Sequence, residues 1–150
     1  MKQKMKSYLK KTFFEITRLC VGKVSNTHRI KSYECSSDGE LKISVLMHLL
    51  QEVSEKHINI LGLGIDFCRK QGFAWVATKY IVHITKYPQR NEKVKISSWI
   101  SENSTSSVVK DALICNMKGD VLVSVSTQWS LISLSSRRPL AVEKHLHMIS

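Results

Sequence analysis

The chain lacks any apolar run of about 20 residues, which is the length that a membrane-spanning helix requires. It also lacks internal repeats and low-complexity segments. Hydrophobic residues make up 43% of the sequence and charged residues 23%, proportions that are typical of a soluble globular protein. A chain of 150 residues has room for one domain with an ordinary core, so no second catalytic domain is expected.

Cysteine is scarce as well, and its spacing matches no motif. The four cysteines, at positions 20, 35, 68 and 115, show neither the close pairs of a zinc site nor the density of a disulfide scaffold. We therefore expect free thiols in a reducing compartment, by default the cytoplasm. The apolar stretch at 13–21 contains Glu15 and Arg18, which would spoil a secretory signal, so export is not expected. The pair His145 and His147 does not argue for a metal site, and no cofactor is predicted.

Acidic residues are nearly absent from the start of the chain. Through Lys31 there are nine basic residues and one acid, a net charge of +8 out of +11 for the whole chain. We assign residues 1–26 to a basic N-terminal arm, in which apolar residues recur at helical spacing: Met5, Leu9, Phe13, Ile16 and Cys20. Such an arm could contact a peripheral membrane surface or an acidic protein, act as an organellar transit segment, or remain a solvated or domain-packed extension. Because no aromatic platform or reading helix accompanies the charge, nucleic acid is not an expected partner.

Residues 27–150 predict one α+β domain. A first strand is expected at 27–35. Ser37 and Glu40 have the spacing of a capping box, so a central helix should begin near Glu40 or Leu41 and end at the glycines 62 and 64. One face of this helix carries Leu46, Leu49, Leu50, Val53, His57, Ile60 and Leu61.

Strand patterns fill the second half of the chain. Strands are expected at 73–87, 94–100, 109–117 and 121–134, separated by turn residues at 88–91, 104–107 and 118–120. One helix packed against four or five antiparallel strands is the predicted arrangement.

A series of short motifs gives a family resemblance through its joint order. The helix contains Leu49-Leu50-Gln51-Glu52-Val53, and it is followed by Trp75, Tyr87-Pro88, Glu92, Val94, Ile96, Trp99, Gly119, Ser126, Trp129 and Arg138-Pro139. This order, over about three quarters of the chain, resembles the first half of plant and bacterial fatty acyl-ACP thioesterases. The resemblance implies a single hotdog domain, in which an antiparallel sheet wraps around one central helix.

The resemblance also has consequences for catalysis. In that family two hotdog domains lie in tandem; the first shapes the acyl pocket, and the second carries a catalytic Asp, Asn and His before its helix and a Glu on the following strand. Placed on this chain, the first three positions fall on Ser36, Asp38 and Glu40, and His83 falls near the strand Glu, so the catalytic set is not matched. A lone hotdog unit leaves an open sheet edge and half a pocket, and we therefore expect a homodimer.

Thioester hydrolysis needs N–H groups that polarise the carbonyl and a base that activates water. The N–H groups of Gly39, Glu40 and Leu41 would supply the donors at the expected start of the helix. Asp38, beside them, is either the base or simply the helix N-cap.

Three further polar residues are weighed for the site. Glu52 is a second candidate base, unless it only forms an ion pair with Lys56 four residues on. Asp38 and Glu52 are roughly 20 Å apart along the helix, so they could share a site only across a dimer. His83 is either a third candidate or a hydrogen-bonded strand histidine, and His57 is interpreted as a packed or capping residue.

The predicted pocket lining completes the functional hypotheses. It comprises Leu46, Leu50, Phe73, Trp75 and Val76. The tryptophans at 75, 99 and 129 are most simply core or interface residues.

The first hypothesis is a thioesterase that hydrolyses fatty acyl thioesters of acyl carrier protein or coenzyme A. The alternative is a catalytically inactive hotdog module that binds acyl groups or a partner; a hydratase or dehydratase is a third option, although no suitable His and Asp pair is found.

Overall fold

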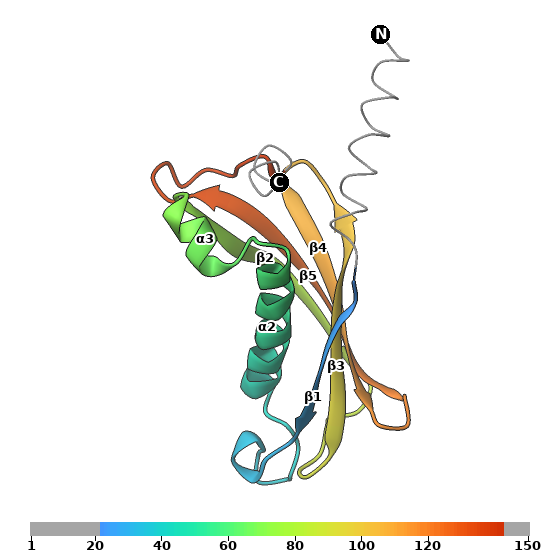
Figure 1. Cartoon of the computed structure of the whole chain (residues 1–150). Coiled ribbons are helices and arrows are strands. Elements are labelled where there is room, and N and C mark those ends of the chain that lie inside the picture. Colours follow the sequence, from blue (N-terminus) through green and yellow to red (C-terminus); the bar gives the residue numbers. More distant parts are fainter. Residues whose placement is uncertain (1–21, 143–150) are drawn as a thin grey trace, which may run out of the picture.

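The computed structural model describes residues 22–142, which form one antiparallel sheet with two α-helices on one of its faces (Figure 1). The helices are α2 (Ile43–Ile60) and α3 (Ile65–Lys70), and a short 3-10 helix, η1, spans Ser32–Glu34. The strands are β1 (Val24–Arg29), β2 (Phe73–Ile84), β3 (Lys93–Asn103), β4 (Ser107–Asn116) and β5 (Val121–Ser133). No helix in these residues has the length and apolarity needed to span a bilayer.

The five strands lie in the order β1-β3-β4-β5-β2, so β1 and β2 form the two edges. Local turn chemistry fixes the hairpin between β4 and β5. There Asn116 Oδ1 accepts hydrogen bonds from the N–H groups of Lys118 (3.0 Å) and Asp120 (2.9 Å), and Gly119 adopts the left-handed φ of 94° that favours glycine.

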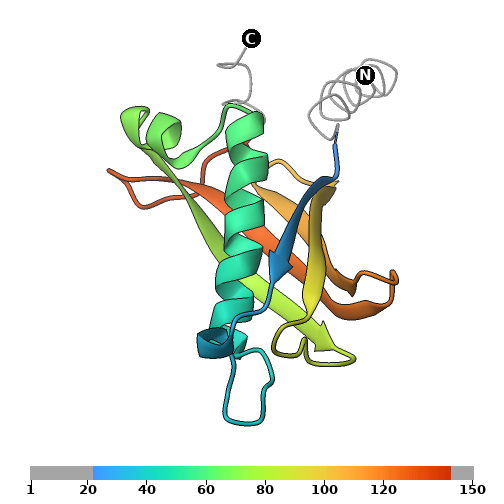
Figure 2. The ribbon, with the colours of Figure 1, turned by 60° about the horizontal axis from the view of Figure 1, so that its bottom comes forward.

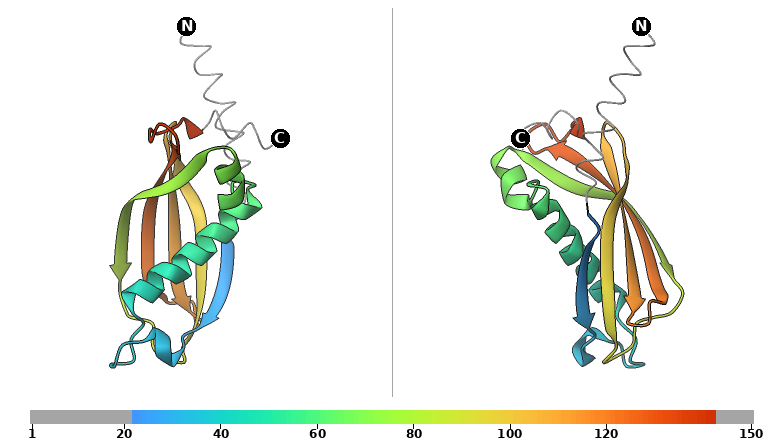
Figure 3. Two further views of the ribbon diagram at one scale, coloured as in Figure 1. Left: turned by 90° about the vertical axis from the view of Figure 1, so that its left-hand side faces the viewer. Right: turned by 45° about the vertical axis from the view of Figure 1, so that its right-hand side comes forward.

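The sheet curls around α2, which crosses it diagonally (Figures 2 and 3). Figure 3 also shows that α2 and α3 lie on the same side of the sheet, with β2 at one edge and β1 at the other. This arrangement confirms the predicted hotdog fold.

The main core lies between α2 and the inner face of the sheet. Alternate strand residues point toward α2 and form cross-strand pairs, such as Ile96 with Ile114 and Ile114 with Val123. From the helix side the core receives Leu46, Leu49, Leu50 and Val53. A second, smaller cluster under α3 contains Cys68, Val108, Leu131 and Val142.

Four details of the sequence prediction are wrong. One helix was expected, whereas α3 is a second helix in the segment before β2. The first strand is β1, which ends at Arg29, and residues 32–34 form η1 in place of strand. The helix begins at Ile43, with Lys42 as its N-cap. Ile60, which was assigned to the apolar helix face, is 65% exposed. The remaining strands begin and end within three residues of their predicted bounds. The basic arm, apart from its last residues 22–26, lies outside the described residues.

Candidate functional site

A cavity of about 70 Å³ lies between the C-terminal half of α2 and the inner face of the sheet, and we call it the α2 cavity. Its volume exceeds the 10–15 Å³ that one water needs on such a measure. The apolar lining residues are Ile58, Leu61, Leu63, Ile65, Trp75, Ile100, Val108, Trp129 and Val142. Four polar residues complete the lining: Gln51, Ser54, Glu55 and Lys110.

Strand register brings the two tryptophans to this cavity. Trp129 on β5 pairs with Val108 on β4, and Trp75 on β2 pairs with Leu131 on β5. Because paired residues share a face of the sheet, and because Val108 and Leu131 are buried in the cluster under α3, both indoles face the helices. The result is a space with aromatic walls, closed on one side by α2.

Lys110 is the least expected member of the lining. It is 4% exposed, and it occupies an inward position on β4 between the buried residues Val108 and Ala112. Its Nζ donates to the carbonyl oxygen of Ser54 at 3.0 Å and to Ser54 Oγ at 2.7 Å. Burial lowers the pKa of Lys110 to about 8. No carboxylate lies within ion-pair distance of Lys110 in the described part of the chain.

His57 lies on the buried face of α2 and is 1% exposed. Neither ring nitrogen has a hydrogen-bond partner among residues 22–142. Burial, and then the positive charge of Lys110, lower the pKa of His57 to about 4. His57 is therefore neutral at physiological pH, which agrees with the interpretation of a packed histidine.

The indole N–H groups of the two cavity tryptophans are also buried without a standard hydrogen bond within the described residues. The Trp75 N–H lies against the Cys68 thiol. Burial raises the pKa of this thiol, and the contact with the Trp75 N–H offsets part of that rise. The Trp129 N–H has no such partner among residues 22–142. Buried donors without acceptors are costly, so the cavity carries unused capacity to donate hydrogen bonds.

The predicted pocket residues lie in different places. Trp75 lines the α2 cavity, and Leu50 lines a smaller hollow next to it. Leu46 is fully buried in the main core, and Phe73 packs against the cluster under α3. Val76 is 38% exposed and alternates with Trp75, so it faces away from the cavity.

The prediction that Asp38 and residues 39–41 lie at the helix start is wrong. Residues 35–41 form a turn, closed by a bridge between Cys35 and Leu41 and tied by a bridge from Glu40 to Gln89. The Gly39 N–H donates to the Ser36 carbonyl at 3.0 Å, and the Leu41 N–H donates to the Pro88 carbonyl at 2.8 Å. These two N–H groups are thus already used, and Asp38 is exposed in the turn.

The other candidate bases lie outside the α2 cavity. Glu52 is exposed on α2, and no ion pair joins it to Lys56 among the described residues. His83 on β2 pairs with Ser124, one position from the buried Val123 and Val125. Because strand residues alternate, His83 points to the face of the sheet opposite α2. There it lines a shallow hollow with Ile81, Trp99 and Asp111.

The structure adds cavity-lining residues that the sequence argument did not select for the pocket: Gln51, Ser54, Glu55, Lys110 and Trp129. One signal for Lys110 was available. Val108, Lys110, Ala112 and Ile114 alternate along β4, and a lysine in such a row stands at an inward position. The helix residues gave no comparable signal, because Ser54 and Glu55 flank the apolar face instead of interrupting it.

The chain is similar in sequence to known proteins. The model of the acyl-ACP thioesterase N-terminal domain matches residues 22–149. The chain belongs to the acyl-ACP thioesterase family. Among its relatives in that family, the acyl-[acyl-carrier-protein] hydrolase of Cuphea viscosissima is 31% identical over 116 residues, covering 73% of this chain and 28% of the relative. The palmitoyl-acyl carrier protein thioesterase of Cuphea hookeriana is 32% identical over 117 residues, with the same coverage.

Solved structures support the same fold. The 12:0-ACP thioesterase from Umbellularia californica is 23% identical with a TM-score of 0.75, and the match covers 85% of this chain and 52% of that one. The DHNA-CoA thioesterase from Staphylococcus aureus is 21% identical with a TM-score of 0.74, covering 82% and 83%. The chain spans less than a third of the length of the curated acyl-ACP thioesterases that it matches.

Proposed function

We propose that this chain is the acyl-binding unit of a thioesterase that hydrolyses fatty acyl thioesters of acyl carrier protein or coenzyme A. The α2 cavity, in a chain of this family, carries the proposal, because most of its lining is apolar and a helix closes it on one side. In the reaction, water gives its hydroxyl group to the acyl carbon and a proton to the leaving sulfur. A free fatty acid and a free thiol result, which would place the enzyme at the end of fatty acid biosynthesis.

An apolar cavity stabilises a bound acyl chain because it removes the methylene groups of the chain from water. Each methylene group that leaves water stabilises the complex by about 0.8 kcal/mol. The chain end would enter beneath the C-terminal half of α2, between Trp75 and Trp129. The thioester itself would then lie outside this cavity, where a second hotdog unit can reach it.

A second unit is proposed because the candidate bases do not meet the cavity within one copy. Asp38, Glu52 and His83 remain proposals for water activation, supplied across a homodimer. The thioester carbonyl would be polarised by the first N–H groups of α2. These belong to Ile43, Ser44 and Val45, and no capping side chain accepts a hydrogen bond from them.

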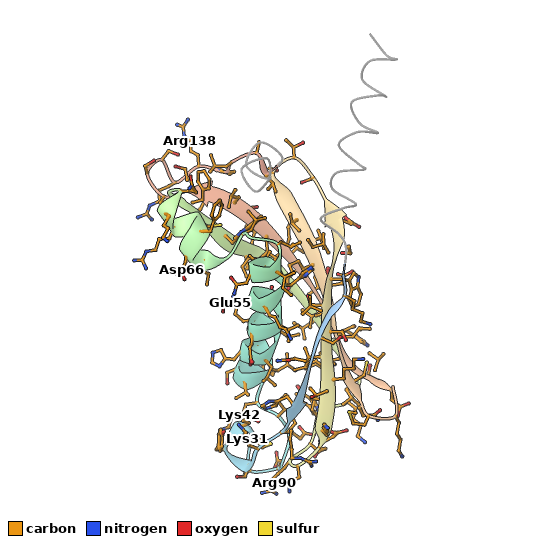
Figure 4. All side chains as sticks on the ribbon, viewed as in Figure 1. Lys31, Lys42, Glu55, Asp66, Arg90 and Arg138 are labelled. Carbon is orange, nitrogen blue, oxygen red and sulfur yellow. The ribbon has the colours of Figure 1, made fainter. Side chains whose placement is uncertain are left out.

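Three basic side chains near the start of α2, which lie among the acidic residues Asp38 and Glu40, support binding of an acidic carrier. Lys31, Lys42 and Arg90 lie together at the lower end of the molecule, whereas Glu55 and Asp66 lie higher (Figure 4). Acyl carrier protein is acidic and coenzyme A carries phosphates, so this surface suits either. We propose that the basic arm adds to this attraction or contacts a membrane surface. Deleting residues 1–21 should then flatten the salt dependence of carrier binding, and equal slopes would reject this role.

The compartment is a separate proposal. The cysteines of the described part, Cys35, Cys68 and Cys115, are free thiols, which agrees with a reducing environment such as the cytoplasm. Fractionation of the native host, with detection of the protein in each fraction, tests this proposal. Recovery in an organelle would overturn it.

The decisive experiment is hydrolysis by the purified protein of a panel of acyl-ACP and acyl-CoA substrates, with detection of the released thiol. We expect turnover on at least one chain length. Asp38→Ala, Glu52→Ala and His83→Ala, tested separately, identify the base by loss of turnover with retained binding. Bound acyl groups without turnover would favour the inactive acyl-binding module, and absence of both binding and turnover would reject the proposed function altogether.

A further inference from the structure

The α2 cavity contains more hydrogen-bond donors than a saturated hydrocarbon chain can use. Lys110 Nζ and the Trp129 indole N–H both lie in its wall, and both are buried. A fatty acyl chain offers them no acceptor. Burying a charged ammonium group in an apolar space is unfavourable unless it is paired or fully hydrogen-bonded.

The existing contacts leave donor capacity unused. Lys110 Nζ has three N–H bonds, and Ser54 provides its two recorded acceptors, the carbonyl oxygen and Oγ. Trp129 Nε1 has no acceptor among the described residues. Glu55 also lines the cavity, yet it is not within ion-pair distance of Lys110.

The position of these donors matters as well. Lys110 and Trp129 line both the α2 cavity and the smaller hollow next to it, which is bordered by Leu50 and Tyr80. They therefore stand where an acyl chain would pass from one space to the other. A ligand atom there would be enclosed on several sides and shielded from water, which strengthens a charge-assisted hydrogen bond.

We propose that the α2 cavity selects acyl chains that carry an acceptor oxygen, such as a hydroxyl, oxo or carboxylate group, and that Lys110 and Trp129 bind this oxygen. This inference rests on the proposed function, because it assumes that an acyl chain enters the cavity. It assigns Lys110 and Trp129 to substrate specificity and not to hydrolysis. The position of the oxygen along the chain is set by which carbon reaches these two donors.

The test uses coenzyme A thioethers, which cannot be hydrolysed and have no acyl carbonyl. The probes are S-dodecyl-CoA, S-(3-hydroxydodecyl)-CoA and S-(12-hydroxydodecyl)-CoA, and titration calorimetry on the full chain measures their affinities. We expect one hydroxylated probe to bind at least about tenfold more tightly than S-dodecyl-CoA, the effect of one charge-assisted hydrogen bond. Which of the two binds more tightly reports the position of the oxygen.

Two variants remove the donors: Lys110→Met keeps the length of the side chain, and Trp129→Phe keeps an aromatic ring, although a smaller one. Lys110→Met and Trp129→Phe should each abolish the preference for the hydroxylated probe while S-dodecyl-CoA still binds. Lys56→Met, on the exposed side of α2, is the matched control and should keep the preference. Lys110→Met is expected to fold, because replacing a buried lone cation by an apolar side chain is often neutral or stabilising.

The possible failures are distinguishable. Equal affinity of the wild-type protein for all three probes would overturn the oxygen preference and leave acyl binding intact. A preference that survives in Lys110→Met and in Trp129→Phe would overturn the assignment of these residues. Absence of binding for every probe, together with absence of turnover on the whole panel of acyl-ACP and acyl-CoA substrates, would overturn the proposed function together with this inference.

Discussion

Two ionisable side chains in the interior, Lys110 and His57, have no carboxylate partner among the described residues. For both, burial favours the neutral form, and the charge of Lys110 acts in the same direction on His57. Each pKa shift also changes the free energy of unfolding with pH, because water solvates these groups freely in the unfolded chain. The protein therefore holds, beside the α2 cavity, groups that lower its stability under conditions where they are charged.

The first prediction concerns His57 and acid stability. The pKa of His57 falls from 6.5 in the unfolded chain to about 4 in the folded protein. Between these values the unfolded state binds a proton that the folded state does not, so the free energy of unfolding decreases as the pH falls from 6.5 towards 4. The loss amounts to up to about 3 kcal/mol. Urea denaturation at pH 7.0, 5.5 and 4.5 measures it.

Suitable variants separate His57 from other groups. His57→Leu should lose most of this pH dependence, whereas His48→Gln, at an exposed position of α2, should keep it. Glu34 contributes in all variants: although its burial acts the other way, the Lys31 N–H and His28 hold the pKa of its carboxyl below the usual range. An unchanged pH profile in His57→Leu would show that His57 can accept a proton in the folded state.

For single residues, the sequence predicted which side chains are buried better than it predicted which side chains contact one another. The alternation of Val94 and Ile96 with lysines along the strand indicates that the two share one face, and helical spacing indicates the same for Leu46 and Val53; all four are buried. The contact of Lys110 with Ser54 could not be predicted, since the two residues are 56 positions apart and meet only through the packing of α2 on β4. Candidate bases chosen for their chemistry alone, such as Glu52, face solvent.

Among the helices and strands, the start of α2 shows how contacts between distant residues can override a local capping motif. The Ser37 and Glu40 spacing suits a capping box. Pairing of Cys35 with Leu41 and of Glu40 with Gln89 instead holds these residues in extended structure. The helix can therefore begin only after Leu41, and it begins at Ile43, behind an N-cap lysine that offers no side-chain cap. The type of this element and its end just before Gly62 were predictable; its first residue depended on contacts with the turn after β2.

The second prediction uses this uncapped helix start. Lys42 has an extended backbone, with φ −62° and ψ 138°, which suits an N-cap residue. Lys42→Asp should place a carboxylate against the first N–H groups of α2 and at the positive end of the helix dipole. We expect stabilisation of about 1 kcal/mol, which raises the thermal midpoint by about 4 °C.

Lys42→Gln is the matched control for this change. It also removes the hydrogen bond from Lys42 Nζ to the Tyr33 carbonyl, at 3.2 Å, but adds no preferred cap. The Asp variant should therefore melt above the Gln variant in circular dichroism. Equal midpoints would mean that the first N–H groups of α2 are already satisfied, for example by water, at no cost.

At the scale of the whole molecule, the sheet has one edge that this chain leaves apolar and uncovered. β2 pairs only with β5, and its other side has no neighbouring strand in the described residues. Three consecutive residues, Tyr80, Ile81 and Val82, are 42%, 55% and 37% exposed. Since consecutive residues point to opposite faces, both faces of β2 are open here. An apolar edge of this kind favours pairing with another strand.

The last prediction is that β2 pairs with β2 of a second copy, as the proposed homodimer requires. A two-fold axis places the same strand of each copy in antiparallel contact, so one substitution changes both sides of the interface at once. Ile81→Lys places two like charges at this edge, and lysine at an edge opposes strand pairing.

Sedimentation velocity should show a dimer for the wild-type protein, and at least about a tenfold weaker association for Ile81→Lys. Met117→Lys, which adds the same charge at a position that is 57% exposed beyond the end of β4, should remain dimeric. A wild-type monomer at micromolar concentration would contradict the proposed homodimer and the pairing of β2 with its copy.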